Sequence, residues 1–362
     1  MDLTDPDFAL NWPAELFIIE VTEIDRIEDP DWQRRIELLL EEAFAGPTPR
    51  EEFNRAAEPR YPGETGQKEA ILSELVTVAP SLPMAAAPRP YYSQRHAARP
   101  EAVLPADAVR RSFVRIVAHL SESGYLAKAF PEGCVDDNSL VPVNESDYIE
   151  ERLGIAGLWP FDSSQESWDD DTFYSLIEVI HDAVARPRRR TWHSWNECGW
   201  HYAEFAVSPA RALYRWRINH LLERSIVPLR LAESGEDIGR MVAVTDAGRS
   251  DLIDRLLEIE EPSVAGRIEH AIALFRSRGA TEHDKRSAII TLAGILEERR
   301  SLLETELFRR DEGALFQIAN QFAIRHQSEF QRADYDPVFL DWVFWWYAAT
   351  IELTNRIIFR DT

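Results

Sequence analysis

Cysteine is nearly absent from this chain, with only Cys134 and Cys198 among 362 residues. Two cysteines are too few for the disulfide framework that holds many small secreted proteins together. Residues 1–5 are acidic and lack the basic and apolar regions of a signal peptide. We therefore expect a cytoplasmic protein.

Long apolar runs and an excess of basic residues are also missing. The longest apolar run, residues 342–349, is far shorter than the ~20 residues that a membrane span needs. With 63 acidic and 40 basic residues the net charge is −23, so the overall field repels nucleic acid and anionic membranes. We expect no membrane contact, and any polyanion has to bind where the local charge differs from that of the whole.

The sequence does have enough apolar residues, 45% with 11 Trp, for a large core and two or three domains. A strand-like run at residues 16–21 and an amphipathic helix at residues 32–44 predict an N-terminal α/β segment over residues 1–58. Eight prolines between residues 59 and 105 predict a Pro/Ala-rich linker or extended arm there.

Residues 106–258 combine helical patterns with strand-like runs. One predicted helix begins with three acidic residues, Asp169, Asp170 and Asp171. Acidic residues at this place cap a helix and complement its dipole more often than they bind metal. Residues 229–231 and 241–244 flank a Gly-containing turn and predict a β-hairpin. We therefore expect an α+β middle domain.

From residue 262 to residue 362 the pattern is purely helical, with helices predicted at residues 263–277, 281–307, 311–326 and 337–360. Thr281 and Asp284 have the spacing of a capping box. The last helix is apolar nearly all round, which predicts a central position with Trp345 and Trp346 at least partly buried. The predicted fold class is mainly α, with an α+β middle domain followed by a C-terminal four-helix bundle.

Two charged or titratable residues continue the apolar stripe of the third bundle helix. The stripe has the i, i+3, i+4, i+7 spacing of one buried helix face, in Leu315, Ile318, Ala319 and Phe322. Arg325 and His326 follow on the same face. A charge set against a buried helix needs a partner or a purpose.

This bundle resembles a HEPN domain, the helical family of prokaryotic defence and toxin ribonucleases. The family motif is Arg, a polar residue, four variable residues and His. Arg325 and His326 match its first two positions, but Gln331 stands where the motif has its final histidine. More widely, residues 315–351 resemble bacterial proteins grouped with abortive infection.

The resemblance implies a protein of antiviral defence that cleaves RNA without metal and pairs as a homodimer through the C-terminal bundle. Its catalytic residues here are Arg325, His326 and Gln331. A histidine can move the proton and an arginine can hold the phosphate, whereas glutamine cannot act as a base. Either His326 has taken over the role of base, or the bundle binds rather than cleaves.

A different class of function fits the same residues. Arg325 and His326 can cap the carbonyls at a helix C-terminus and pair with Glu329 or Asp334. On this interpretation the protein is a non-catalytic adaptor that binds nucleic acid or another protein through a degenerate bundle.

One stretch departs from the acidic whole, and we name residues 186–224 the basic island. It holds eight arginines against three acidic residues, with interleaved tryptophans as stacking surfaces for RNA or a nucleotide. The residues predicted to bind nucleic acid are Arg186, Arg188, Arg189, Arg190, Arg211 and Arg215. The alternative is that these arginines neutralise acidic surfaces elsewhere in the protein.

The basic island also contains His193, Cys198 and His201. Their spacing loosely resembles a zinc site, but a structural zinc has four ligands in paired short spacings. Only Glu197 or the distant Cys134 could complete the set, so the sequence favours a buried thiol with two hydrogen-bonded histidines. We predict no metal and no cofactor. We also expect His181, on an apolar stripe, to be a hydrogen-bonded core residue.

Overall fold

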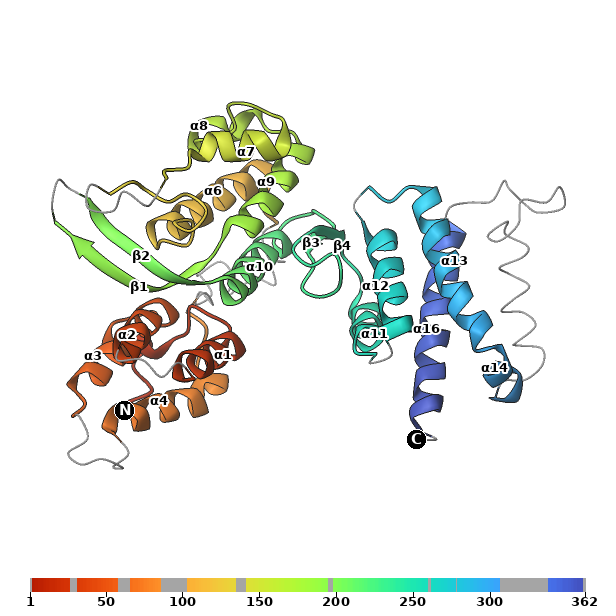
Figure 1. The fold of residues 1–362 in the computed structure, drawn as a ribbon, viewed down its shortest axis with the longest axis horizontal. Coiled ribbons are helices and arrows are strands. Elements are labelled where there is room, and N and C mark those ends of the chain that lie inside the picture. The colour runs from red at the N-terminus through yellow and green to blue at the C-terminus, as the bar shows by residue number, and fades with distance from the viewer. Residues whose placement is uncertain are drawn as a thin grey trace, which may run out of the picture. The chain divides into compact units, whose positions relative to one another are not determined.

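The computed structural model describes residues 2–26, 31–57, 66–85, 103–134, 141–194, 198–259, 262–277, 279–306 and 338–360. The chain divides into two compact units, Met1–Ile226 and Val227–Thr362. The described residues are mainly helical and include two antiparallel hairpins, which confirms the predicted fold class (Figure 1). The predicted β-hairpin belongs to unit 2, whereas the rest of the middle region shares unit 1 with the N-terminal segment.

Unit 1 begins with the helices α1 (Ala14–Asp25), α2 (Trp32–Ala43), α3 (Thr48–Arg55) and α4 (Gln67–Val78). The strand predicted at residues 16–21 is wrong, because these residues lie in α1. Leu16, Phe17, Val21 and Ile24 are buried together on one helical face. Burial of this stripe outweighs the β preference of the local Ile and Val residues.

Part of the predicted linker is also helical. Within residues 59–105, α4 places Leu72 and Leu75 in the core, against α1 and α3. The prolines of this stretch therefore flank a packed helix rather than mark one continuous arm.

The middle of unit 1 contains α6 (Ala106–Glu122), α7 (Glu145–Leu153), α8 (Phe161–Ser164) and α9 (Asp170–Ala183). Phe113 of α6 packs against Phe161, Trp168 and Phe173, with ring centroids 5.5–6.2 Å apart. The Asp169 side chain accepts a hydrogen bond from Thr172 N at 2.7 Å, so its predicted role as a helix cap is confirmed.

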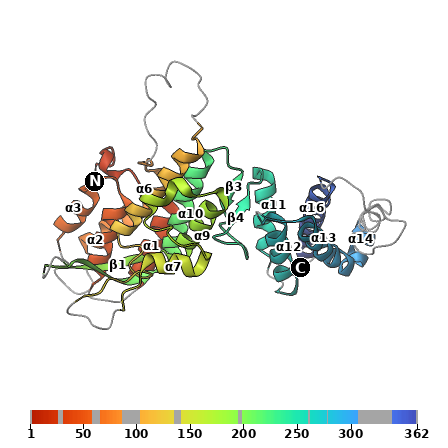
Figure 2. The same ribbon diagram turned by 90° about the horizontal axis from the view of Figure 1, so that it is seen from above.

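A hairpin absent from our predictions, β1 (Arg186–His193) with β2 (Gly199–Ala206), continues into α10 (Val207–Glu223). Its first strand is rich in arginine and lacks the apolar alternation that marks a half-buried strand. The hairpin passes between α1–α4 on one side and α6–α9 on the other (Figure 1). Helix α10 packs beside α6 in both views (Figures 1 and 2).

Ion pairs join β1 to the N-terminal helices. Arg186 and Glu20 are both fully buried, and Arg186 Nη1 donates to Glu20 Oε1 at 2.8 Å. Arg186 Nε also donates to Glu42 Oε2 at 2.8 Å, and Arg188 binds Glu20 at the same distance. The two ends of unit 1 in sequence are therefore held together by buried charge.

Removing Arg186 leaves the buried Glu42 without its arginine partner and leaves Glu20 with Arg188 alone. We predict that Arg186→Met lowers the free energy of unfolding by about 3–5 kcal/mol, since breaking a buried pair strands the other charge. The control is Arg190→Ala, which removes a half-exposed arginine paired with Glu41 and should cost about 0–1 kcal/mol. Urea unfolding measures both, and equal small losses would contradict the assignment.

Unit 2 opens with the predicted hairpin, β3 (Leu229–Leu231) paired with β4 (Met241–Ala243), which is confirmed. It continues with α11 (Ala247–Leu257), α12 (Pro262–Arg276), α13 (Glu282–Glu298), α14 (Arg300–Glu306) and α16 (Val338–Arg360). Buried side chains of all five helices form one core. The capping box of Thr281 and Asp284 is present, as predicted.

Two details of unit 2 differ from the prediction. The helix predicted at residues 281–307 ends at Arg299 and restarts as α14, and Arg299 Nη1 donates to Thr354 Oγ1 and Asn355 Oδ1, both at 2.7 Å. Helix α16 is not buried all round, because Trp342 is 50% exposed. Trp345 and Trp346 are partly buried against the core, as predicted.

The core of unit 2 depends on one aromatic stack. Phe344 is fully buried and lies on Phe275 with ring centroids 3.7 Å apart. We predict that Phe344→Ala costs about 3–5 kcal/mol of unfolding free energy. Trp342→Ala on the same helix should cost only about 1–2 kcal/mol, because half of that ring is already in water. Thermal unfolding compares the two variants, and a larger loss for Trp342→Ala than for Phe344→Ala would contradict the central role of the Phe275–Phe344 stack.

Candidate anion-binding cleft

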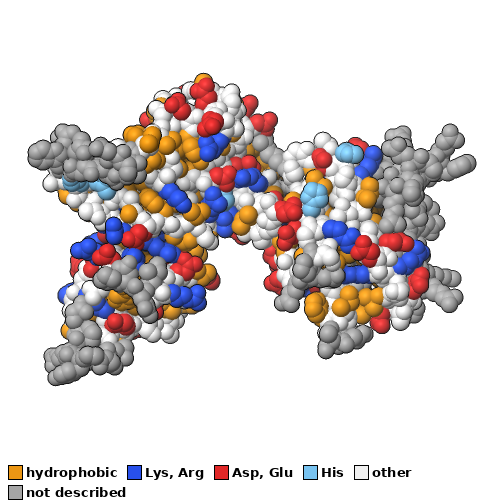
Figure 3. Space-filling model, viewed as in Figure 1, with side chains coloured by type: hydrophobic (Ala, Val, Ile, Leu, Met, Phe, Trp, Pro, Cys, Tyr) orange, Lys and Arg blue, Asp and Glu red, His pale blue; other side chains and the backbone are white. Residues whose placement is uncertain are grey.

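Four arginines of the basic island have carboxylate partners in unit 1. Besides the pairs of Arg186 and Arg188, Arg189 pairs with Asp31 and Glu204, and Arg190 pairs with Glu41. Arg186 has no exposed side-chain surface, so no phosphate can reach it without rearrangement. On the face drawn in Figure 3, basic and acidic side chains are interspersed. For these four arginines the structure favours the alternative, neutralisation of acidic groups.

The network includes a strained residue. Glu204 is the one described non-glycine residue with a positive φ, 58°. Its carboxylate lies 2.7 Å from Arg35 Nη2 and 3.2 Å from Arg189 Nη1. The two ion pairs offset the cost of this backbone conformation.

Arg211 and Arg215 lie on α10 and contact α9. Arg211 Nη2 donates to the carbonyl oxygen of Asp182, and Arg215 Nη1 donates to His181 Nε2. Burial lowers the pKa of His181 to about 4, so the ring is neutral at pH 7 and its Nδ1–H donates to Asp182. His181 is a hydrogen-bonded core residue, as expected.

The predicted catalytic residues Arg325, His326 and Gln331 lie outside the described residues.

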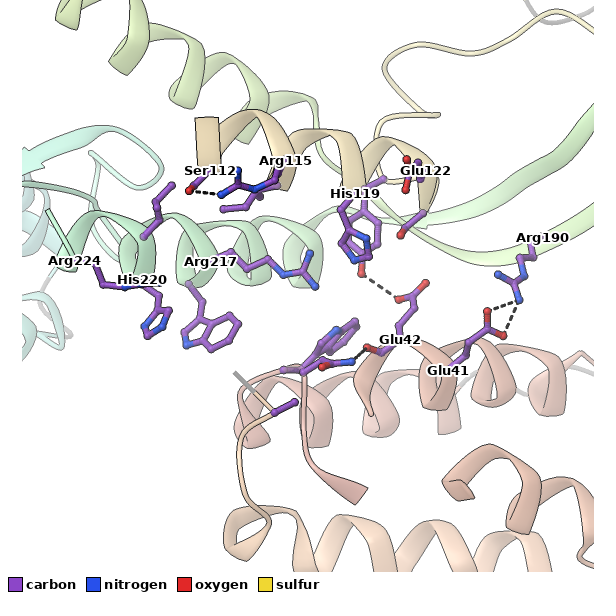
Figure 4. A pocket seen from close by; sticks show the side chains of 18 residues that line it. Glu41, Glu42, Ser112, Arg115, His119, Glu122, Arg190, Arg217, His220 and Arg224 are labelled. Carbon is purple, nitrogen blue, oxygen red and sulfur yellow. Dashed lines mark hydrogen bonds and ion pairs between the residues drawn. The ribbon is translucent and has the colours of Figure 1, made fainter. Parts of the chain in front are cut away.

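A cleft of about 790 Å³ gathers basic side chains that the sequence analysis did not select (Figure 4). Helix α6 contributes Arg115 and His119, and the α10 region contributes Arg217, His220 and Arg224. Each set has the i, i+3, i+4, i+7 type of spacing that aligns residues on one helix face. The basic residues at this spacing on each helix were therefore the sequence signal that could have pointed to the cleft.

Arg217 points into the cleft near His119 and Glu42 (Figure 4). Burial lowers its pKa, and the nearby Tyr125 and Glu42 partly offset that effect. Glu42 Oε2 accepts hydrogen bonds from Arg186 Nε at 2.8 Å and from the Tyr125 hydroxyl at 3.1 Å. Within the described residues Arg217 hydrogen-bonds to no carboxylate, so its donors remain available to a ligand.

The cleft also offers aromatic surface. The Trp216 ring stacks on His220, with centroids 6.1 Å apart and planes 10° from parallel, and both side chains line the cleft. The volume lies in the range of small-molecule sites. Guanidinium groups beside a stacking ring are the combination that binds a phosphate and a nucleobase.

A second hollow of about 610 Å³ on unit 1 provides a contrast. It also has several arginines, but each is paired with a carboxylate. The arginines that line it are Arg34, Arg50, Arg55, Arg189 and Arg190, and their carboxylate partners are Asp31, Glu41, Glu51 and Glu204. Their charge is already neutralised, so an anion gains less there than beside Arg217.

The structure brings the His/Cys residues of the basic island together with Cys134. The ligand atoms of Cys134, His193, Cys198 and His201 all lie within 4.8 Å of one another. All four side chains are partly buried.

No family model matches the sequence, and comparison with curated proteins and with solved structures found no match. In the described part of the chain no helix combines the length and apolar composition needed to cross a bilayer.

Proposed function

We propose that this protein binds a nucleotide in the cleft between α6 and α10, with Arg217 holding a phosphate. The observation that carries the proposal is that Arg217 hydrogen-bonds to no carboxylate among the described residues, whereas the arginines of β1 all pair with acids. Arg115 and Arg224 also line the cleft and would bind further phosphate oxygens, and the base would stack on the Trp216 ring. On this proposal the protein is a non-catalytic nucleotide-binding protein of the cytoplasm, which differs from both functions expected from the sequence, the ribonuclease and the adaptor.

The first experiment measures ATP binding to the full chain by calorimetry at low salt. Arg217→Ala should weaken ATP binding by about tenfold to a hundredfold, since a hydrogen bond to a charged group contributes about 1.5–3 kcal/mol. The control is Arg34→Ala, which removes an exposed arginine of the second hollow and should leave affinity unchanged.

The pH dependence gives this experiment a second readout. In the free protein, burial and the charge of Arg217 lower the pKa of His119. A bound phosphate acts in the opposite direction, so binding takes up a proton and ATP affinity should rise as the pH falls from about 8 toward 6. His119→Gln should flatten this dependence. Binding of single-stranded RNA with no binding of ATP would overturn the nucleotide proposal.

A second candidate function rests on the motif of Arg325 and His326. We propose that a homodimer of the C-terminal region cleaves RNA without metal, with His326 as the base, in a bacterial defence protein. His326→Ala should then abolish cleavage of a labelled RNA with little change in melting temperature.

The control variant for this candidate is Gln331→His, which restores the family pattern and should increase cleavage. If neither wild type nor Gln331→His cleaves RNA as a folded dimer, the bundle is an adaptor rather than a nuclease.

A further inference from the structure

The tip of the β1–β2 hairpin gathers four side chains of the kinds that bind zinc. His193 ends β1, Cys198 and His201 lie at the start of β2, and Cys134 comes from the loop that follows α6. Cys134 and Cys198 are the only cysteines of the chain and are 64 residues apart in sequence. Both nevertheless lie at this one place.

The pleat of the hairpin explains how the two histidines meet. His193 pairs with Gly199, and Thr191 pairs with His201, so His193 and His201 lie on the same face of the hairpin. Trp192 and Trp200 pair on the opposite face, with ring centroids 5.1 Å apart. A Trp-His dipeptide in each strand therefore directs one ring to each side.

Cys198 lies directly before β2, next to a glycine with an unusual backbone conformation. Gly199 has φ +82°, a left-handed conformation that side-chain-bearing residues rarely adopt. This bend places Cys198 Sγ 3.3 Å from His201 Nε2, on the side from which Cys134 approaches. Cys198 therefore joins the two histidines and Cys134 in one group of four.

The distances between the ligand atoms fit a tetrahedron around one ion. Cys134 Sγ is 3.8 Å from Cys198 Sγ and 3.7 Å from His193 Nδ1, and Cys198 Sγ is 3.3 Å from His201 Nε2. Zinc bonds of about 2.3 Å to sulfur and about 2.0–2.1 Å to nitrogen give tetrahedral edges of about 3.8 Å for S–S and about 3.5 Å for S–N. The observed spacings match these edges within a few tenths of an ångström.

We propose that Cys134, His193, Cys198 and His201 bind one zinc ion as a closed structural site. Two thiolates and two imidazoles suit Zn²⁺ and exclude Mg²⁺ and Ca²⁺, which take oxygen ligands. Four protein ligands leave no open coordination position for a substrate, so the role of the ion is structural and not catalytic. The site links the hairpin tip to the loop after α6 and is independent of the nucleotide cleft.

From the sequence we predict no metal, because Cys134 lies far along the chain from His193, Cys198 and His201. The structure removes that objection, since the loop after α6 returns Cys134 to the hairpin. A disulfide is the competing use of these two thiols, but their sulfur atoms are 3.8 Å apart, against about 2.05 Å in a disulfide.

The test is the metal content of the full chain purified under reducing conditions, measured by elemental analysis. One zinc per chain is expected for the wild type, and Cys198→Ser and His193→Gln should lose it. The control is His283→Gln, an exposed histidine of α13, which should retain the full zinc content. Chelation should lower the melting temperature of the wild type and leave that of Cys198→Ser unchanged.

A cobalt titration keeps the test decisive if the variants fail to fold. Wild-type protein stripped of metal and titrated with Co²⁺ should develop the visible absorption of a tetrahedral cobalt thiolate, and added Zn²⁺ should remove it. Both cysteines should react with a thiol reagent only after the metal is removed. No zinc in the purified protein and no cobalt absorption, or a Cys134–Cys198 disulfide under reducing conditions, would overturn the proposal.

Discussion

The buried charge of Arg186 is the constraint on which unit 1 depends. A guanidinium with no exposed surface needs carboxylates at hydrogen-bond distance, and Glu20 of α1 and Glu42 of α2 supply them. The N-terminal helices therefore have to pack on β1, although more than 140 residues separate the partners in sequence. Arg188, Arg189 and Arg190 extend the same contact toward the surface. The four arginines of β1 thus complement acids of the first 42 residues, and Arg189 also pairs with Glu204.

The pairing of Arg186 with Glu42 also determines which arginine of the cleft can bind a ligand. Glu42 lies on the wall of the cleft, and burial raises its pKa despite the opposing charge of Arg186. Because Arg186 and Tyr125 take up its hydrogen bonds, Glu42 attracts Arg217 across the cleft without holding it. The charge of Glu42 partly offsets the lowering of the Arg217 pKa by burial, and Arg217 makes no hydrogen bond to a carboxylate of the described residues, which favours the proposed phosphate site.

Periodicity predicted most of the helices and the β3–β4 hairpin, because their apolar faces repeat at the helix or strand period. It failed at α1, where residues that favour strands form a buried helical stripe, and at β1–β2, where arginines occupy the positions that usually carry apolar side chains. The site residues were harder to predict. A count of arginines cannot show that Arg186 is paired while Arg217 has no hydrogen-bonded carboxylate among the described residues, since the difference lies in carboxylates distant in sequence. The sequence drew attention to His193, Cys198 and His201 but not to a complete ligand set, because Cys134 is close to His193 only in the folded chain.

The β1–β2 hairpin is fixed at both ends by side chains remote in sequence. At its base Arg186 binds Glu20 and Glu42, and at its tip His193, Cys198 and His201 meet Cys134. Each of these two contacts closes a long loop of the chain. The entropic cost of loop closure rises only slowly with loop length, so a strong ion pair or metal bond can offset that cost. Both ties rely on polar or metal-binding groups, since the exposed Trp192 and Trp200 bury little apolar area. β1 packs against α2 and α10, two of the elements that line the cleft, so these contacts add to the apolar core of unit 1 in positioning the cleft walls.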